Sequence, residues 1–138
     1  MGWQDRISEI IPREICLPAV GQGAIGIEMR SEDLEVQTLT GPLNCADTAA
    51  AVSAERSFLA KLEGGCQVPV GALGEVIEGK LNLEGMVASL DGTLIFKEHI
   101  KGLPSAAGDL GTALAGKLLK QGCGSILEQI RMECSIHD

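Results

Sequence analysis

The sequence changes its hydrophobic period at Gly64-Gly65, and this change constrains the fold more than any other feature. Apolar residues before the two glycines recur at the spacing of one helix face, and those after them alternate as in a strand. The glycines let the backbone turn sharply, and Pro69 stiffens the chain beyond them. We therefore predict a helix from Asp47, its expected cap, to Glu63, packed through Ala51, Ala54, Phe58 and Leu62.

Three strand patterns follow this helix. The first covers residues 67–76, the second residues 80–87, and the third residues 93–100. Glu78-Gly79 and Asp91-Gly92 separate them, and Asp-Gly favours a hairpin turn because both residues tolerate positive φ. The three segments therefore predict an antiparallel sheet.

Two helices are predicted after the strands. Residues 109–121 place leucines on one side, and Gly122 ends the pattern. Ser125 and Glu128 have the spacing of a capping box at the start of a last short helix. The predicted fold class is therefore α+β, a three-stranded antiparallel sheet covered on one face by helices.

The residues before this unit follow other patterns. Residues 1–16 predict a short helix and a connector. Residues 24–29 are apolar, follow Gly21-Gln22-Gly23, and predict a buried strand entered through a glycine-rich turn. Residues 31–40 predict a helix, with Ser31 as a candidate cap.

Gly41-Pro42 breaks the chain and gives the best domain boundary. We expect residues 1–43 to be a connector, strand and helix, and residues 44–138 to form a separate C-terminal domain. On this division, the contacts of residues 17–29 within the chain should be sparse, and residues 46–138 should form a core without them.

The composition is typical of a folded globular domain, with 138 residues, 45% hydrophobic and 22% charged. The net charge of −8 argues against nucleic-acid binding, and no apolar run approaches the ~20 residues that span a bilayer. The cysteines are scattered and odd in number, so we predict neither a disulfide framework nor a metal site, and we expect a reducing compartment. They are Cys16, Cys45, Cys66, Cys123 and Cys134.

Cys66 is the candidate reactive residue, because it lies between the double glycine and a strand pattern. A thiol on a shaped loop suits a covalent attachment point, with Gly65 and Gln67 beside it. The alternative is that Cys66 is a small hydrophobic residue at a helix end. The C-terminal end of a helix carries negative partial charge, so the sequence does not explain how this thiol would be activated.

Three blocks together resemble the porphobilinogen deaminase (hydroxymethylbilane synthase) family. They are Leu17-Pro18-Ala19-Val20-Gly21-Gln22-Gly23-Ala24-Ile25-Gly26-Ile27-Glu28-Met29-Arg30, then Ala54-Glu55-Arg56 with residues 62–70, then Ser89-Leu90-Asp91-Gly92. Their order and spacing are more specific than any one block. The resemblance implies a C-terminal portion of a larger, three-domain enzyme, in which residues 1–43 belong with the preceding α/β domains.

The resemblance also implies a chemistry. In that family, the cysteine at the position of Cys66 carries a dipyrromethane cofactor through a thioether bond. The cofactor primes the addition of four porphobilinogen units, which are released as linear hydroxymethylbilane, a transferase reaction of heme biosynthesis in the cytoplasm. Gln22 and Gly23 lie in a family segment that lines the cleft, so they are candidate cofactor contacts, the alternative being that the glycines only shape a turn.

Much of the expected machinery is absent from these residues. No block corresponds to the family's catalytic aspartate, and few arginines are present for the carboxylates of porphobilinogen and the growing bilane. Partners would therefore include the missing N-terminal domains, and the fragment alone should be inactive. Arg56 is expected at a domain interface or in a surface ion pair. A small redox-sensing or protein-binding module with an exposed Cys66 is the alternative function.

Overall fold

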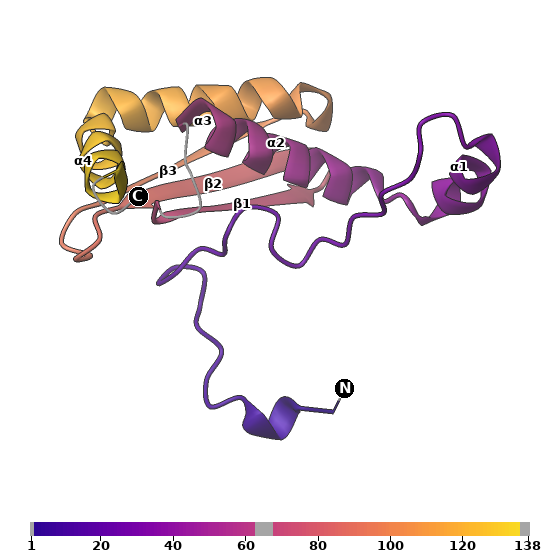
Figure 1. Ribbon diagram of the computed structural model, residues 1–138, viewed down its shortest axis with the longest axis horizontal. Helices are drawn as coiled ribbons and strands as arrows, with labels where there is room; N and C mark the ends of the chain where they lie inside the picture. Colours follow the sequence, from indigo (N-terminus) through magenta and orange to yellow (C-terminus); the bar gives the residue numbers. More distant parts are fainter. Residues whose placement is uncertain (1, 63–67, 136–138) are drawn as a thin grey trace.

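The computed structural model describes residues 2–62 and 68–135. It confirms the predicted α+β fold: strands β1 (Val70–Ile77), β2 (Lys80–Ala88) and β3 (Ile95–Gly102) form one sheet in that order (Figure 1). Helices α2 (Ala46–Leu62) and α3 (Ala107–Gln121) lie side by side over one face of the sheet. Helix α4 (Gly124–Ser135) follows α3 and lies across one end of this layer.

Both strand pairs are antiparallel and in regular register. Gly74 faces Leu83, and Leu83 faces Ile100 on the third strand. The first hairpin turns at Glu78 and Gly79, which have φ values of 50° and 71°. Two successive positive φ values match the twist of the flanking strands, which is why this short connection holds the register.

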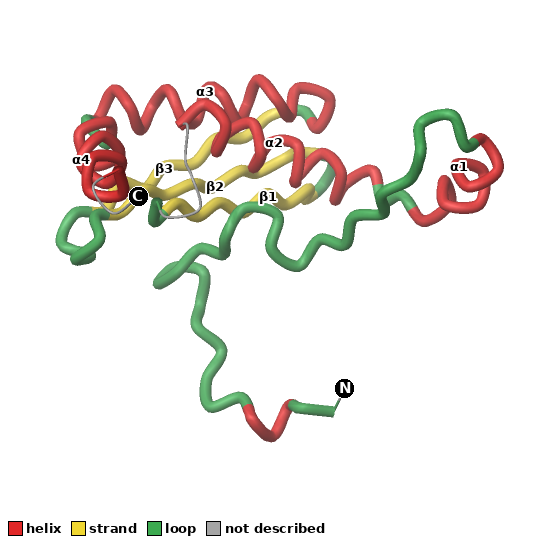
Figure 2. The backbone as a smooth tube through the Cα atoms, in the orientation of Figure 1, coloured by secondary structure: helices red, strands yellow, loops and turns green. Residues whose placement is uncertain are grey.

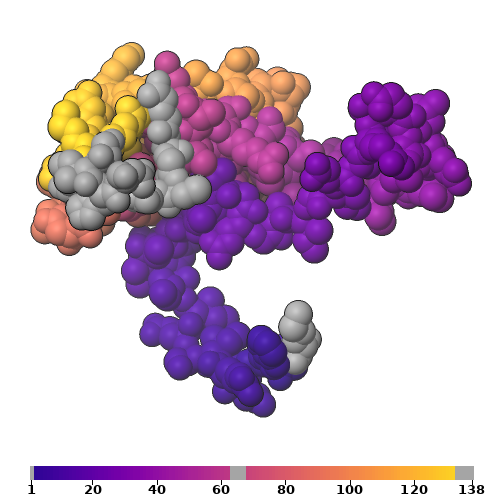
Figure 3. Space-filling model, in the orientation of Figure 1, coloured from indigo at the N-terminus to yellow at the C-terminus, as the bar shows by residue number. Residues whose placement is uncertain are grey.

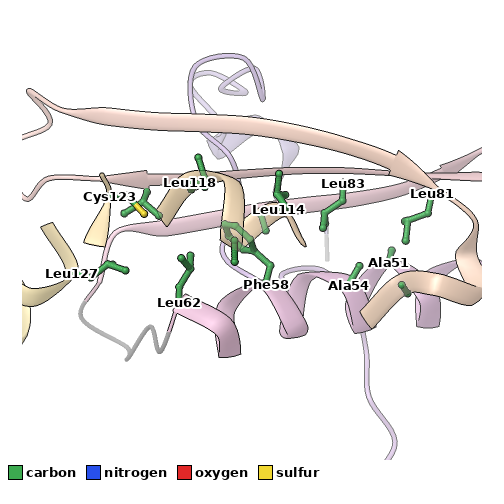
Figure 4. Close-up of a cluster of buried hydrophobic side chains, with 14 residues drawn as sticks. Ala51, Ala54, Phe58, Leu62, Leu81, Leu83, Leu114, Leu118, Cys123 and Leu127 are labelled. Atoms are coloured by element: carbon green, nitrogen blue, oxygen red, sulfur yellow. The ribbon is translucent and has the colours of Figure 1, made fainter. Parts of the chain in front are cut away.

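The core lies between the helix layer and the sheet (Figure 4). Phe58 of α2 is completely buried and lies among leucines of β2 and α3. Burial of a side chain of this size stabilises the fold by roughly 1.5–3 kcal/mol. The other labelled members are Ala51, Ala54, Leu62, Leu81, Leu83, Leu114, Leu118, Cys123 and Leu127.

Helix α2 crosses β1 at very short range. A Cβ built on Gly74 would lie 3.0 Å from the Cα atom of Ala51. Only a glycine on the strand and a small residue on the helix permit this approach. The close crossing brings the next turn of α2, which includes Glu55, within reach of the strand backbone.

The predicted end of α3 is confirmed, but its start and the start of α4 differ from the prediction. Helix α3 begins at Ala107 because the 3₁₀ turn η3 (Pro104–Ala106) leads directly into it. Gly122 ends it at φ 106°. The predicted capping box of α4 is wrong: the helix starts at Gly124, and the Ser125 hydroxyl donates to the carbonyl of Gly122 at 2.9 Å.

The cap predictions for the first two helices were also wrong. Helix α1 (Leu34–Thr40) is capped by Asp33, whose carboxylate accepts the backbone N–H of Val36, and not by Ser31. Helix α2 begins at Ala46, which places Asp47 inside its first turn. An acidic residue there is still favourable, because it faces the positive end of the helix dipole.

The predicted strand over residues 24–29 does not form, and the short helix predicted within residues 1–16 is limited to a single 3₁₀ turn. The chain is irregular there apart from the 3₁₀ turn η1 (Gln4–Arg6), and the connector runs past β1 as an extended loop (Figure 2). Ile25 is 95% exposed. A strand needs a hydrogen-bonded neighbour, and the described residues offer none to this segment.

The residues before α2 project from the body of the molecule (Figure 3). Their exposed side chains include many that are large and apolar: Trp3, Ile7, Ile10, Ile11, Ile15, Ile25, Ile27, Leu34, Leu39 and Leu43. Leu17 is the exception, because it is 5% exposed and packs on Gly71 of β1. Contacts of this segment with the sheet are thus made at residues 17–21 and at Arg13, which pairs with Glu75 of β1.

Candidate functional site

Cys66, Gly65 and Gln67 lie outside the described residues, but both flanks of this segment are anchored in the core. Leu62, the last residue of α2, is 1% exposed, and Val68 packs against the same cluster. Arg131 of α4 donates from Nη2 to the carbonyl oxygen of Leu62 at 3.0 Å. A guanidinium therefore lies at the C-terminal end of α2, where it offsets the negative partial charge of the helix.

The glycine-rich turn is held by hydrogen bonds at both ends of residues 19–22. The backbone N–H of Gln22 donates to the Ala19 carbonyl at 3.0 Å, and Gln22 Oε1 accepts the N–H of Ala19 at 3.1 Å. Gly21 and Gly23 have φ values of 73° and 87°, which β-carbon-bearing residues rarely adopt. Since the amide oxygen of Gln22 accepts this hydrogen bond, the NH₂ group is the part of the side chain that can donate to a ligand.

Glu55 connects this turn to the sheet. The side chain rises from α2 and is 5% exposed. Its Oε2 atom accepts the backbone N–H of Gly21, and its Oε1 atom accepts that of Gly74 on β1, each at 2.7 Å. Such short bonds to a charged acceptor are among the stronger ones in proteins.

A second contact holds the connector along the outer edge of β1. The N–H of Ala72 points away from β2 and donates to the carbonyl of Pro18 at 3.1 Å. Together with the Glu55 contact to Gly74, this bond occupies two alternate outward amides of the strand. The connector thus has a fixed position from Leu17 to Gly21.

A groove of about 900 Å³ lies between α2 and the segment 24–29. Arg56 lines it, together with the hydroxyls of Thr48, Ser53 and Ser57. Grooves of this size accommodate small organic ligands. Its one guanidinium and several hydroxyl donors suit an anionic group.

A smaller groove of about 340 Å³ lies on the other side of the glycine turn. Gln22 and Gly23 line it, and so do three carboxylates, those of Asp47, Glu55 and Glu75. Like charges repel in such a space. The carboxylates of an anionic ligand are therefore better placed in the larger groove, on the Arg56 side.

Arg56 is exposed, and it forms no ion pair with the described residues. The surface ion pair considered for it would need a nearby carboxylate. Glu55, its neighbour in sequence, is engaged with two backbone amides instead. Arg56 is thus an exposed cation that lines the groove of about 900 Å³.

Cys45 precedes α2 and lines the same groove. The hydroxyl of Thr48, and then its backbone N–H, hydrogen-bond to the sulfur and hold the pKa of the Cys45 thiol below its usual range. Cys123 differs, since burial in the core raises the pKa of its thiol. The surroundings therefore favour the thiolate form more at Cys45 than at Cys123.

Neither a metal-ligand cluster nor a membrane-spanning helix is found in the described part of the chain. No three histidine, cysteine or acidic side chains gather there to hold a metal ion. No helix in it is both long and apolar enough to cross a bilayer.

The structure therefore brings Gln22 and Gly23 next to α2 and β1, whereas the other three predicted site residues lie outside the described residues. The sequence reasoning missed Glu55 as the residue that joins these elements. A signal was present: Glu55 falls on the same helix face as Ala51, Phe58 and Leu62, where a charged residue needs buried partners. It also missed Arg131, which no pattern linked to α2.

Two family models match the chain in consecutive order. "Porphobilinogen deaminase, dipyromethane cofactor binding domain" matches residues 1–38, and "Porphobilinogen deaminase, C-terminal domain" matches residues 49–120. Cys66 and Glu55 lie in the second range, and Gln22 and Gly23 lie in the first.

Curated relatives agree with these matches. The chain is 51% identical over 133 residues to porphobilinogen deaminase of Pelotomaculum thermopropionicum, which covers 96% of this chain and 43% of the relative. The enzymes of Carboxydothermus hydrogenoformans (45% identity, covering 98% and 43%) and Desulforudis audaxviator (49% identity, covering 95% and 42%) are similarly related. The chain thus spans about two fifths of the length of these relatives, and it belongs to the porphobilinogen deaminase family.

Proposed function

We propose that this chain is the C-terminal part of a hydroxymethylbilane synthase, which joins four porphobilinogen units into linear hydroxymethylbilane. The observation that carries the proposal is the pair of family matches. They lie in the expected order and cover residues 1–38 and 49–120. The proposed tether is Cys66, which would carry the dipyrromethane cofactor through a thioether bond.

The described residues fit such a group on one side of the glycine turn. The groove of about 900 Å³ is large enough, and Arg56 supplies a positive charge for ligand carboxylates. We propose that the cofactor extends past the turn, so that the Gln22 NH₂ group and the Gly23 backbone, which line the smaller groove, contact another part of it beside Gly65 and Gln67. When bound, the cofactor supplies the pyrrole end to which new units are added.

Attachment at Cys66 requires a thiolate and an electrophilic methylene carbon. Porphobilinogen provides that carbon when ammonia leaves, and the sulfur–carbon bond forms as the thiol loses its proton. The guanidinium of Arg131 at the end of α2 supports this step, because it offsets the helix charge that would disfavour a thiolate nearby.

The rest of the machinery is proposed to come from the N-terminal domains. The described grooves contain one arginine and three carboxylates, so they cannot neutralise the acidic side chains of porphobilinogen and a growing bilane. The exposed apolar residues of 1–43 are the proposed contact surface for those domains. We assign no catalytic acid to this chain, and we propose that it is inactive alone and that the whole enzyme is cytoplasmic.

The boundary proposed between residues 43 and 44 is supported by two observations. It falls in the gap between the two family matches, at residues 39–48. It also coincides with the 3₁₀ turn η2 (Gly41–Leu43), which separates the projecting α1 from α2.

Intact mass of the full-length protein tests the proposed tether. We expect a dipyrromethane adduct on the wild type and on the Cys45→Ser control, and no adduct on Cys66→Ser, whose fold should be unchanged. An adduct retained by Cys66→Ser would contradict the assignment. A wild type that shows reversible thiol oxidation and no adduct would instead support the redox-sensing module.

Turnover by the purified 138-residue chain tests the assignment of chemistry to the missing half. We expect no consumption of porphobilinogen above background. Activity that persists after removal of host enzyme would show that the chain contains its own catalytic acid.

A further inference from the structure

Glu55 has an environment unlike that of an ordinary stabilising residue. It is a carboxylate at 5% exposure, on the face of α2 that otherwise carries alanine, phenylalanine and leucine. Among the described residues it has no basic partner. A buried charge costs stability unless it is compensated, so an apolar residue would serve simple packing better.

In the described part of the chain, the compensation comes from two backbone amides of different segments. Gly21 lies in the range matched by the cofactor-binding domain of the family, whereas Gly74 and Glu55 lie in the range matched by the C-terminal domain. Each amide is 2.7 Å from a different oxygen of the same carboxylate. One side chain therefore fixes the distance between the glycine turn and β1.

We propose that Glu55 is a positioning residue that sets the place of the Gly21-Gln22-Gly23 turn relative to the sheet. The turn separates the two grooves, so its place decides where the NH₂ group of Gln22 faces. A carboxylate is required because each of its oxygens only accepts hydrogen bonds. Glutamine has the same length but offers a single acceptor and adds a donor that would face an N–H.

Hydrogen exchange of the 138-residue chain, resolved at individual amides by NMR, tests the positioning role. In Glu55→Gln we expect the Gly21 amide to exchange at least about tenfold faster, while Leu83 and Leu114 in the core keep their protection. The matched control is Glu128→Gln, which removes the same charge from an exposed position on α4. Unchanged protection of both glycine amides in Glu55→Gln would overturn the proposal.

A second variant keeps the test informative if glutamine prevents folding. Glu55→Asp keeps the charge but is too short to bridge both amides. It should therefore retain protection at one glycine and lose it at the other. Full protection at both would overturn the proposal.

The consequence for catalysis rests on the proposed function and is measured in the full-length protein. Glu55→Gln should keep the adduct mass at Cys66. We expect a several-fold lower kcat, with KM for porphobilinogen changed by less than about twofold, because the arginines that bind the substrate are proposed to lie in the N-terminal domains. An unchanged kcat would contradict the positioning role. Absence of the adduct from the wild type would contradict the proposed function, leaving the exchange result to stand separately.

Discussion

Gly111 of α3 lies directly on the backbone of α2, so that a Cβ at this position would overlap the carbonyl oxygen of Ala54. The contact involves main-chain atoms on both helices and cannot be relieved by a rotamer change. Gly111 therefore sets the distance between the two helices that cover the sheet.

We expect Gly111→Ala to lower the free energy of unfolding by about 3 kcal/mol, because the helices must move apart. Gly116→Ala on the same helix is the control, since nothing lies within 4 Å of its added Cβ. That variant should gain about 0.5–1 kcal/mol through helix propensity. Urea unfolding of both variants measures the difference, and similar free energies would disprove the close contact.

Phe58 and Gly85 should be energetically coupled. A Cβ at Gly85 would lie 2.6 Å from Cζ of the Phe58 ring. We expect Gly85→Ala and Phe58→Leu each to destabilise the chain by about 1–3 kcal/mol. The double variant should lose about 1 kcal/mol less than the sum. Strictly additive changes in the free energy of unfolding, as expected for the control pair Phe58→Leu with Gly116→Ala, would show that the ring and the strand do not meet.

The reactivity of Cys45 should depend on Thr48. The Thr48 hydroxyl lowers the pKa of this thiol by favouring the thiolate, so Thr48→Val should raise that pKa. At a pH below the Cys45 pKa of both the wild type and Thr48→Val, alkylation of Cys45 by iodoacetamide should then be slower in Thr48→Val than in the wild type. Above both values the rates should converge, because the thiol is ionised in each. Peptide-resolved alkylation across pH checks this, with Thr112→Val on α3 as the control. Equal rates at every pH would contradict it.

Residues 44–138 should fold without the preceding segment. Removal of residues 1–43 exposes the site of Leu17 and leaves Glu55 with one partner. We expect the truncated chain to unfold cooperatively but with about 2–4 kcal/mol less stability, from lost burial and from the hydrogen bonds lost at Glu55, Ala72 and Glu75. Thermal and urea unfolding test this. A truncated chain without a cooperative transition would place the connector within the same core.

The elements that depend on local pattern were predictable from the sequence. The alternation of Leu81, Leu83 and Val87 and the stripe of Ala54 and Phe58 reflect one-sided burial, so period and face could be inferred together. Helix starts were less certain, because Asp33 and Ser31 are both good caps and only the backbone path decides between them.

The remaining differences arise from contacts between distant residues. The apolar run at Ile25 and Ile27 has strand character, but a strand forms only beside a partner. Glu55 was visible as a charge on an apolar face, yet its partners are backbone amides 34 and 19 residues away, which leave no side-chain pattern. Arg131 donates to the backbone carbonyl of Leu62, 69 residues away. This contact also leaves no side-chain pattern in the sequence.

The occupied amides of Ala72 and Gly74 also affect how the molecule meets other chains. A bare outer strand is a template on which another polypeptide can add by main-chain pairing, the first step of many aggregation reactions. At β1, such an incoming strand would have to displace the Pro18 carbonyl and the Glu55 carboxylate. The buried carboxylate would then lose the hydrogen-bond donor that Gly74 provides. The connector thus protects this side of the sheet against intermolecular β-pairing while the chain is folded.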